Sequence, residues 1–334
     1  MLKPIPLHNQ SSWQDSLSDL ITDPLELLQL LGIQPEQIDL SMEVLREFPL
    51  RVPRSFVNRM QPCDPHDPLL LQVLPRQKEL ASYSGFIADP LAEQQFNPKP
   101  GLLHKYSGRV LLMPTSSCAI HCRYCFRRHF PYAENRPNKK QWLESLEYIL
   151  ADSSINEIIL SGGDPLVISD KHLEWLLEHL TAIPHLQRVR IHTRFPVVIP
   201  QRINQNFCSL LSRYQLRFII VLHTNHAQEI DGDVQAACKM LKDAGIDLFN
   251  QSVLLKGIND DAQVLVNLSE RLFACGVTPY YLHLLDKVKG SGHFDVDITT
   301  AKVIMKKLRA LLPGYLVPTL VYEQVGEPNK TPIL

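Results

Sequence analysis

The chain has 334 residues, of which 45% are hydrophobic and 21% charged, and its 34 Lys and Arg nearly balance its 35 Asp and Glu. This composition is that of an ordinary globular protein, and the even charge argues against a nucleic-acid partner or an anionic membrane surface. No apolar run approaches the roughly 20 residues that a membrane-spanning helix needs. The sequence therefore predicts a cytoplasmic protein.

The first 105 residues are predicted to form an extension of short helices and loops. Helical patterns occur at 13–21 and 24–31, and proline-rich connections follow at 51–54 and 64–68. Because proline at this density breaks long elements, we expect this part of the chain to pack on a larger body.

From residue 106 to residue 334 the pattern becomes regular. Short apolar runs alternate with amphipathic stretches of about 10–15 residues, which predicts βαβ units and a parallel sheet. The predicted strands lie at 109–114, 155–160, 188–193, 217–223, 248–255 and 278–285, and the predicted helices at 139–150, 170–180, 201–214, 234–244, 262–275 and 299–312. A partial (β/α)6 barrel and a doubly wound sheet both fit, and in either fold ligands gather at the carboxyl ends of the strands.

A group of three cysteines follows the first strand of this regular region. Cys118, Cys122 and Cys125 have the spacing C-x3-C-x2-C, with an aromatic residue before the last cysteine. Three thiolates on one loop can hold three irons of a [4Fe–4S] cluster and leave the fourth iron open to a small molecule. A structural zinc site is the alternative, but it needs four protein ligands, and His121 is the candidate for the fourth.

The second predicted strand ends in Ser161-Gly162-Gly163-Asp164-Pro165. One interpretation is a glycine-rich turn in which Asp164 caps the start of a helix. The other is a ligand-binding loop, which its place at the end of the second strand favours.

Together these motifs resemble the radical S-adenosylmethionine superfamily. In that superfamily the open iron binds the amino and carboxyl groups of S-adenosylmethionine, and the reduced cluster cleaves it to methionine and a 5′-deoxyadenosyl radical. The resemblance implies a partial (β/α)6 radical-SAM barrel that carries a mainly helical N-terminal extension. It also implies that the segment after the second strand contacts S-adenosylmethionine through Ser161, Gly162, Gly163 and Asp164.

The resemblance is more specific over residues 106–331, which are similar to the lysine 2,3-aminomutase family. The matching segments are 106–112, Arg127-Arg128 directly after Cys125, 250–255, 279–281 and the tail at 318–332. Members of this family combine the cluster with pyridoxal 5′-phosphate, and the resemblance implies that Lys330 bonds to it, although a lysine near a chain end is normally solvated. The family usually has several glycines before this lysine, whereas here only Gly326 keeps the freedom to adopt a positive φ.

The family match also implies contacts with pyridoxal phosphate and with the substrate. Tyr106 and Arg109 are expected beside the cofactor, with Gln251 near its phosphate. Arg127 is expected to bind the substrate α-carboxylate through its two-pronged guanidinium.

Two acidic residues are expected to face the distal ammonium of the substrate, which needs counter-charge in a dry pocket. These are Asp286 and Glu323, and each taken alone is an ordinary acid at the end of a strand. Where Glu323 aligns, enzymes that act on free lysine carry aspartate, so the side chain here is one methylene longer.

The function implied by the resemblance is that of an L-lysine 2,3-aminomutase, an isomerase that converts (S)-α-lysine to (R)-β-lysine by a radical 1,2-amino shift. The sequence lacks the cysteine-rich extension of clostridial members. It resembles the short bacterial branch, which supplies β-lysine to a ligase that modifies elongation factor P and which draws electrons from a donor such as flavodoxin or ferredoxin. The alternatives are an aminomutase acting on glutamate or arginine and a non-catalytic iron–sulfur protein.

Overall fold

The computed structural model describes residues 12–131, 135 and 138–334. Its body is a curved nine-stranded sheet in the order β11-β10-β9-β8-β7-β6-β5-β4-β3. All neighbouring strands from β4 to β10 are parallel, and β3 and β11 pair antiparallel at the two edges. The strands are β3 Leu102–Tyr106, β4 Arg109–Thr115, β5 Glu157–Gly162, β6 Arg188–Thr193, β7 Arg217–His223, β8 Asp247–Val253, β9 Thr278–His283, β10 Thr319–Tyr322 and β11 Thr331–Pro332.

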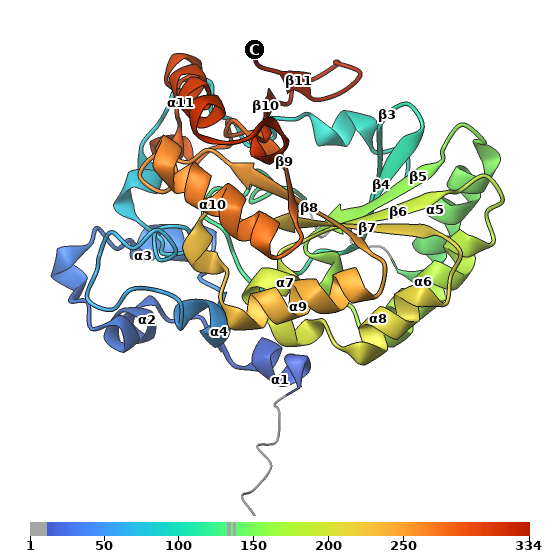
Figure 1. The fold of residues 1–334 in the computed structure, drawn as a ribbon, viewed down its shortest axis with the longest axis horizontal. Helices are drawn as coiled ribbons and strands as arrows, with labels where there is room; N and C mark the ends of the chain where they lie inside the picture. Colours follow the sequence, from blue (N-terminus) through green and yellow to red (C-terminus); the bar gives the residue numbers. More distant parts are fainter. Residues whose placement is uncertain (1–11, 132–134, 136–137) are drawn as a thin grey trace, which may run out of the picture.

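The strand order identifies the architecture as a partial barrel. Strands that are neighbours in the sheet are also neighbours in the sequence, so the order never reverses as it does in a doubly wound sheet. Helices cover the outer face of the curved sheet (Figure 1). The main ones are α5 Lys139–Ala151, α6 Asp170–Thr181, α8 Gln205–Ser212, α9 Gly232–Asp243, α10 Ala262–Ala274 and α11 Ile298–Leu311. The six predicted strands and six predicted helices of this region are confirmed, with ends shifted by a few residues.

Helix α6 illustrates why these amphipathic segments become helices. The Ser169 side chain accepts a hydrogen bond from the backbone N–H of His172 and so caps the first turn. Four leucines at helical spacing form one buried face, and each contributes roughly 1.5–3 kcal/mol by leaving water. They are Leu173, Leu176, Leu177 and Leu180.

The sequence did not predict the two ends of the sheet. Strand β3 is short and its register with β4 shifts between Leu103 and Tyr106, while β10 has only four residues. Such short segments carry too little alternation to indicate a strand. Because β3 spans residue 105, the predicted division of the chain between 105 and 106 falls inside this strand and stays a prediction.

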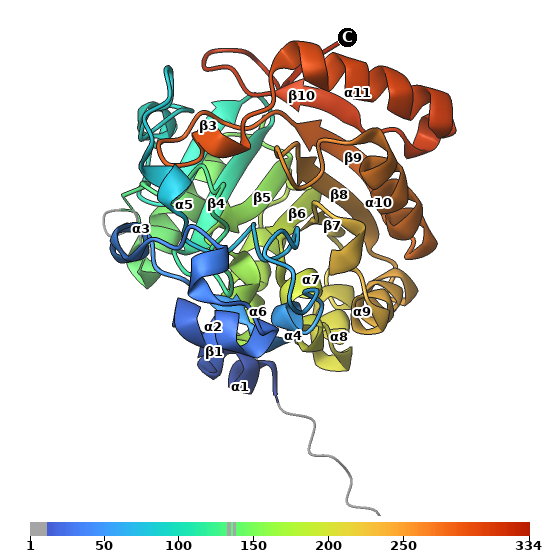
Figure 2. The ribbon, with the colours of Figure 1, turned by 90° about the vertical axis from the view of Figure 1, so that its left-hand side faces the viewer.

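The N-terminal extension packs beside the barrel (Figure 2). It consists of α1 Trp13–Ser18, β1 Leu20–Ile21, α2 Pro24–Leu31, α3 Met42–Glu47, β2 Val52–Pro53, α4 Arg54–Val57, short 3-10 turns and loops. The helix predicted at 13–21 is wrong in its last part, because residues 20–21 pair with β2 and thereby bury Ile21. The extension shares one hydrophobic core with the barrel, in which Phe56 and Phe195 are fully buried.

Within the described residues, none of the helices has the length and apolar character needed to cross a membrane.

Candidate active site

A cavity of about 810 Å³ fills the inside of the barrel. Alternate residues of the strands line it, as the period of two in a strand requires, among them Ile219, Val221 and His223 of β7. Its volume lies near the upper end of the range of about 300–1,000 Å³ for ligand pockets, so it has room for more than one small molecule. Every residue that the sequence singled out as a site residue lines this one cavity.

The three cysteines lie on the loop after β4 and face the cavity. Burial raises the pKa of Cys118, with smaller contributions from Asp164 and the two other thiols, and burial together with Cys122 raises the pKa of Cys125 to about 11. As the side chains stand, no three His, Cys, Asp or Glu residues in the described ranges form a group that could hold a metal ion. The fit of a four-iron cluster therefore rests on the donor set, three thiols on one loop beside an open cavity.

An arginine donates a hydrogen bond to one of these sulfurs. Arg194 lies just after β6 and donates a hydrogen bond from Nη1 to Cys122 Sγ at 2.7 Å. The second terminal nitrogen, Nη2, donates to Gln72 Oε1 at 2.7 Å and to Glu229 Oε2 at 2.9 Å, so the guanidinium is fixed in place. The hydrogen bond from Nη1 fixes the position of the Cys122 sulfur beside the cavity.

The N-terminal extension holds the cysteine loop. Glu79 accepts two hydrogen bonds from Arg123, at 2.9 and 2.7 Å, and one from Arg128 at 2.8 Å. His121 is also engaged by the extension, because its Nδ1 lies 2.9 Å from the Pro49 carbonyl oxygen and its ring stacks on Phe48. The extension therefore engages Nδ1 of His121.

We expect Glu79→Gln to destabilise the protein by about 3–5 kcal/mol, because it leaves two buried guanidinium groups without counter-charge. The exposed fractions are 0% for the side chain of Arg123 and 2% for those of Arg128 and Glu79. Urea unfolding measures the loss. The matched control is Asp243→Asn, which breaks an exposed ion pair with Lys239 and should change stability by less than about 0.5 kcal/mol. Equal stability of the two variants would contradict the anchoring role of Glu79.

Gly162, which ends β5, and Gly163, which follows it, allow this strand to approach the backbone of the cysteine loop. Gly162 has a φ of +107°, and a side chain at Gly163 would collide with the backbone of Ser117. The backbone N–H of Asp164 then donates to the Ser117 carbonyl oxygen at 2.8 Å. The two glycines therefore join the end of the second parallel strand to the loop that carries the cysteines.

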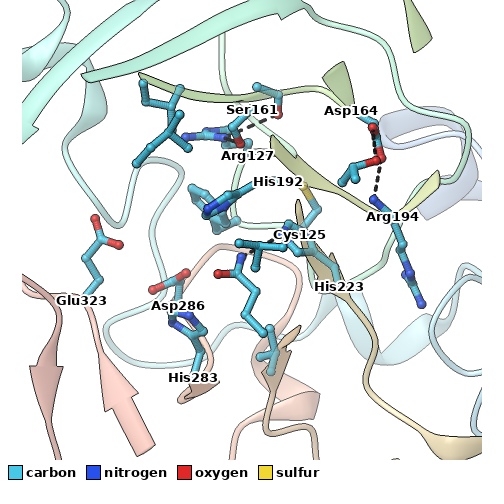
Figure 3. Close-up of a pocket in the computed structure, with 18 of the residues that line it drawn as sticks. Cys125, Arg127, Ser161, Asp164, His192, Arg194, His223, His283, Asp286 and Glu323 are labelled. Atoms are coloured by element: carbon cyan, nitrogen blue, oxygen red, sulfur yellow. Dashed lines mark hydrogen bonds between the residues drawn. The ribbon is translucent and has the colours of Figure 1, made fainter. Parts of the chain in front are cut away.

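Asp164 has the capping geometry that one sequence interpretation predicts. Its carboxylate accepts hydrogen bonds from the Leu166 N–H at 3.1 Å, the Thr193 hydroxyl at 2.6 Å and the Arg194 N–H at 2.7 Å (Figure 3). Burial raises its pKa to about 6, while these hydrogen bonds act in the opposite direction. A contact of Asp164 and Ser161 with S-adenosylmethionine stays a prediction.

On the other side of the cavity, an acidic residue holds two lysines. Lys330 Nζ donates to Glu323 Oε2 at 2.9 Å, and Lys105 Nζ donates to Glu323 Oε1 at 3.2 Å. Although burial opposes the ionised form of Glu323, the two ammonium groups lower its pKa to about 2. The carboxylate is therefore ionised at any physiological pH.

Asp286 lies near Glu323 in the same cavity but has a different environment (Figure 3). No hydrogen bond from another described residue reaches its carboxylate. Burial, together with the charge of Glu323, raises the pKa of Asp286 to about 7. A carboxyl group of this kind is suited to receive a cation that enters the cavity.

Arg127 already binds a carboxylate of the protein. Its Nε and NH2 donate to the two oxygens of Glu93 at 2.7 and 2.8 Å, and NH1 donates to Ser161 Oγ at 3.2 Å. Glu93 belongs to the extension, in the short 3-10 helix η3 Glu93–Phe96. The predicted contact of Arg127 with a substrate carboxylate stays a prediction, and the structure adds that Glu93 holds one edge of the guanidinium.

The residues that the sequence predicts to contact pyridoxal phosphate also line the cavity. The Arg109 guanidinium lies over the Tyr106 ring, 4.7 Å from its centroid, and forms no ion pair with a described residue. Gln251 Nε2 lies 2.8 Å from His223 Nε2. An arginine without a protein counterion is suited to an anionic ligand such as a phosphate.

Sequence reasoning missed several polar residues of the cavity wall. His192, His223 and His283 stand near the carboxyl ends of β6, β7 and β9, and burial lowers the pKa of all three, that of His223 to about 3. The buried Nε2 atoms of His192 and His283 have no partner among the described residues. Their shared position near strand ends is the signal that could have identified these neutral imidazoles.

Known proteins resemble this chain along nearly its full length. The Radical SAM superfamily model matches residues 112–218, which include the cysteines and the two glycines. An L-lysine 2,3-aminomutase from Escherichia coli (strain K12) is 51% identical over 326 residues, 97% of this chain and 95% of its own length. Another from Haemophilus influenzae is 50% identical, over 97% of this chain and 96% of its own.

A more distant relative, the glutamate 2,3-aminomutase of Clostridioides difficile, is 34% identical over 98% of this chain and 76% of its own length. The much higher identity to the two lysine aminomutases, together with the cysteine loop inside a partial barrel, places the chain among them. The chain belongs to the L-lysine 2,3-aminomutase family, within the radical S-adenosylmethionine superfamily.

Proposed function

We propose that the protein is an L-lysine 2,3-aminomutase that converts α-lysine to β-lysine by a radical 1,2-amino shift. The observation that carries this proposal is that the predicted site residues line one cavity. The cysteine loop lies on one side, and Lys330 with Glu323 and Asp286 lies on the other. A radical generator and an amine that can bond to a carbonyl cofactor are the two components that such a reaction needs.

The cysteines and Lys330 are the residues that would hold the two cofactors. Cys118, Cys122 and Cys125 would bind a [4Fe–4S] cluster whose open iron takes S-adenosylmethionine, the source of the radical. Lys330 would bond to pyridoxal phosphate, which would give the amino nitrogen an imine π-bond open to attack by a carbon radical, so that the nitrogen can move from the α-carbon to the β-carbon. Arg109, with Tyr106 beside it and Gln251 further along the wall, would bind the anionic part of this cofactor.

The charges of the cavity favour lysine over glutamate as the substrate. Asp286 and Glu323 would repel a side-chain carboxylate and attract an ammonium, while Arg127 would contact the α-carboxylate. The test is to supply lysine, arginine and glutamate at equal concentration to the reconstituted enzyme and to identify the β-amino acids by mass spectrometry. We expect β-lysine as the main product, and a predominance of β-glutamate would overturn the proposal.

The preference for lysine should depend on pH through Asp286. Its pKa of about 7 means that it is ionised above this pH and neutral below it. Because only the ionised form pairs with an ammonium, lysine affinity should be highest above pH 7 and should fall by up to about tenfold per unit below it. Norleucine, which lacks the distal amine, is the control, and the ratio of the two affinities cancels other titrations. A ratio that stays constant from pH 6 to pH 8.5 would contradict this role.

We also propose a physiological role. The β-lysine would be consumed by a ligase that modifies elongation factor P, and a flavodoxin or ferredoxin in the cytoplasm would reduce the cluster. Support for this role comes from the resemblance of the sequence to the short bacterial branch of the family. Loss of the β-lysyl group from elongation factor P after deletion of the gene would support it, and an unchanged modification would exclude it.

A further inference from the structure

Lys105, which the sequence did not single out, is a cation fixed inside the wall of the cavity. It lies on the edge strand β3, and its side chain is 13% exposed. Its ammonium donates to the Leu91 carbonyl oxygen at 3.2 Å and to Glu323 Oε1 at 3.2 Å, and it lies 3.9 Å from Glu93 Oε1. An ammonium has three N–H donors, and this one faces three acceptors.

Lys105 thereby connects the two carboxylates that hold Arg127 and Lys330. Glu93 binds Arg127, and Glu323 binds Lys330. Both oxygens of Glu323 are engaged, Oε1 by Lys105 and Oε2 by Lys330. When Lys330 bonds to a carbonyl cofactor and gives up its ammonium form, Lys105 still neutralises Glu323.

Asp286 forms no direct ion pair with a described residue, although the more distant Lys330 and Lys105 oppose the rise of its pKa. It lines the same cavity, and no hydrogen bond from another described residue reaches its carboxylate, whereas Glu323 accepts one on each oxygen. A partly buried carboxylate without a direct partner gains more from an incoming ammonium than one that is already paired. The two acids of the pocket are therefore not equivalent.

We propose that Lys105 is a specificity-determining residue that keeps Glu323 occupied as a structural counterion and so leaves Asp286 as the carboxylate that receives the distal ammonium of the substrate. This inference rests on the proposed function and divides the roles of the two acids within it. The pocket then presents one unpaired negative charge, which matches an amino acid with one distal cation.

A double-mutant cycle in the holoenzyme tests the division of roles. The readout is the ratio of lysine to norleucine affinity, measured by optical titration of the bound pyridoxal phosphate without S-adenosylmethionine. In the parent background Asp286→Asn should reduce this ratio about 100-fold, because the substrate ammonium loses the one pocket carboxylate that has no direct partner. In the Lys105→Met background the same change should reduce it less than about tenfold, because Glu323 has lost its partner and can take over.

Lys105→Arg is the matched control, because it keeps the positive charge, so Asp286→Asn should again cost about 100-fold. If Lys105→Met folds poorly, Lys105→Gln replaces it, since its amide can still donate to Leu91. Equal losses in the parent, Met and Gln backgrounds would overturn the role of Lys105. If the parent binds norleucine and lysine with equal affinity, the proposed function itself fails. This result differs from equal losses in the three backgrounds, which would overturn only the role of Lys105.

Discussion

Replacing Lys330 with alanine should abolish both the covalent attachment of pyridoxal phosphate and the amino shift, while the iron–sulfur absorbance stays unchanged. The side chain of Lys330 lines the cavity and donates a hydrogen bond to Glu323, whereas the cysteines lie on a separate loop after β4. Loss of the amine therefore removes one cofactor without disturbing the other. The substitution also removes one of the two ammonium groups that donate to Glu323. Because the other, that of Lys105, still neutralises Glu323, the pocket should remain folded.

Borohydride reduction followed by peptide mapping measures the attachment. In the parent protein the phosphopyridoxyl mass should be found on the peptide that contains Lys330. Lys287→Ala, at an exposed lysine, is the matched control and should label like the parent. Recovery of the label on a different lysine of the parent protein would show that the family resemblance misplaces this residue, which follows an unusual sequence, Gly326-Glu327-Pro328-Asn329.

The second large effect concerns the cluster. Alanine at Cys118, Cys122 or Cys125 should reduce the iron content from about four atoms per chain to nearly none, because two thiolates do not retain a cluster that needs three. Cleavage of S-adenosylmethionine and the amino shift should be lost together. These variants should still bond pyridoxal phosphate at Lys330, the converse of the result for Lys330→Ala.

Anaerobic reconstitution followed by iron analysis and absorbance spectroscopy checks this expectation. Cys63→Ala is the control, since Cys63 is exposed and does not line the cavity, and it should retain the full cluster. A triple alanine variant that still carried about four irons would contradict the assignment of the three cysteines.

The sequence predicted the features of the fold and site that depend on local spacing. The alternation of apolar runs and amphipathic stretches indicated the core strands and helices, because each element buries one periodic face. The spacing of Cys118, Cys122 and Cys125 indicated one loop at a strand end, where the structure places them. The choice between a partial barrel and a doubly wound sheet required the strand order, which no local pattern contains.

The residues that sequence reasoning missed act through contacts between distant segments. Glu79 reaches Arg123 from the extension, and Glu93 reaches Arg127 across 34 positions of the chain. Lys105 meets Glu323 across 218 positions. Glu79, Glu93 and Lys105 belong to no motif with a fixed spacing, so their roles appear only when distant segments are placed beside the cavity.

These contacts also change the interpretation of the pocket acids. Sequence resemblance treats Asp286 and Glu323 as two equal partners of the substrate ammonium. In the structure the ammonium groups of Lys330 and Lys105 lower the pKa of Glu323 to about 2, whereas burial raises that of Asp286 to about 7. Two acidic residues in the same cavity can therefore have different roles, because their neighbouring residues shift their pKa values in opposite directions.

The central claim is that one cavity combines a radical source with a pyridoxal phosphate lysine to move the amino group of lysine. The most direct test is anaerobic incubation of the reconstituted protein with iron, sulfide, a reductant, S-adenosylmethionine, pyridoxal phosphate and α-lysine, followed by chromatographic analysis of the amino acids. We predict β-lysine in the complete mixture and none when either S-adenosylmethionine or pyridoxal phosphate is omitted. Complete loading of both cofactors without any β-lysine, or β-lysine formed without S-adenosylmethionine, would contradict the account.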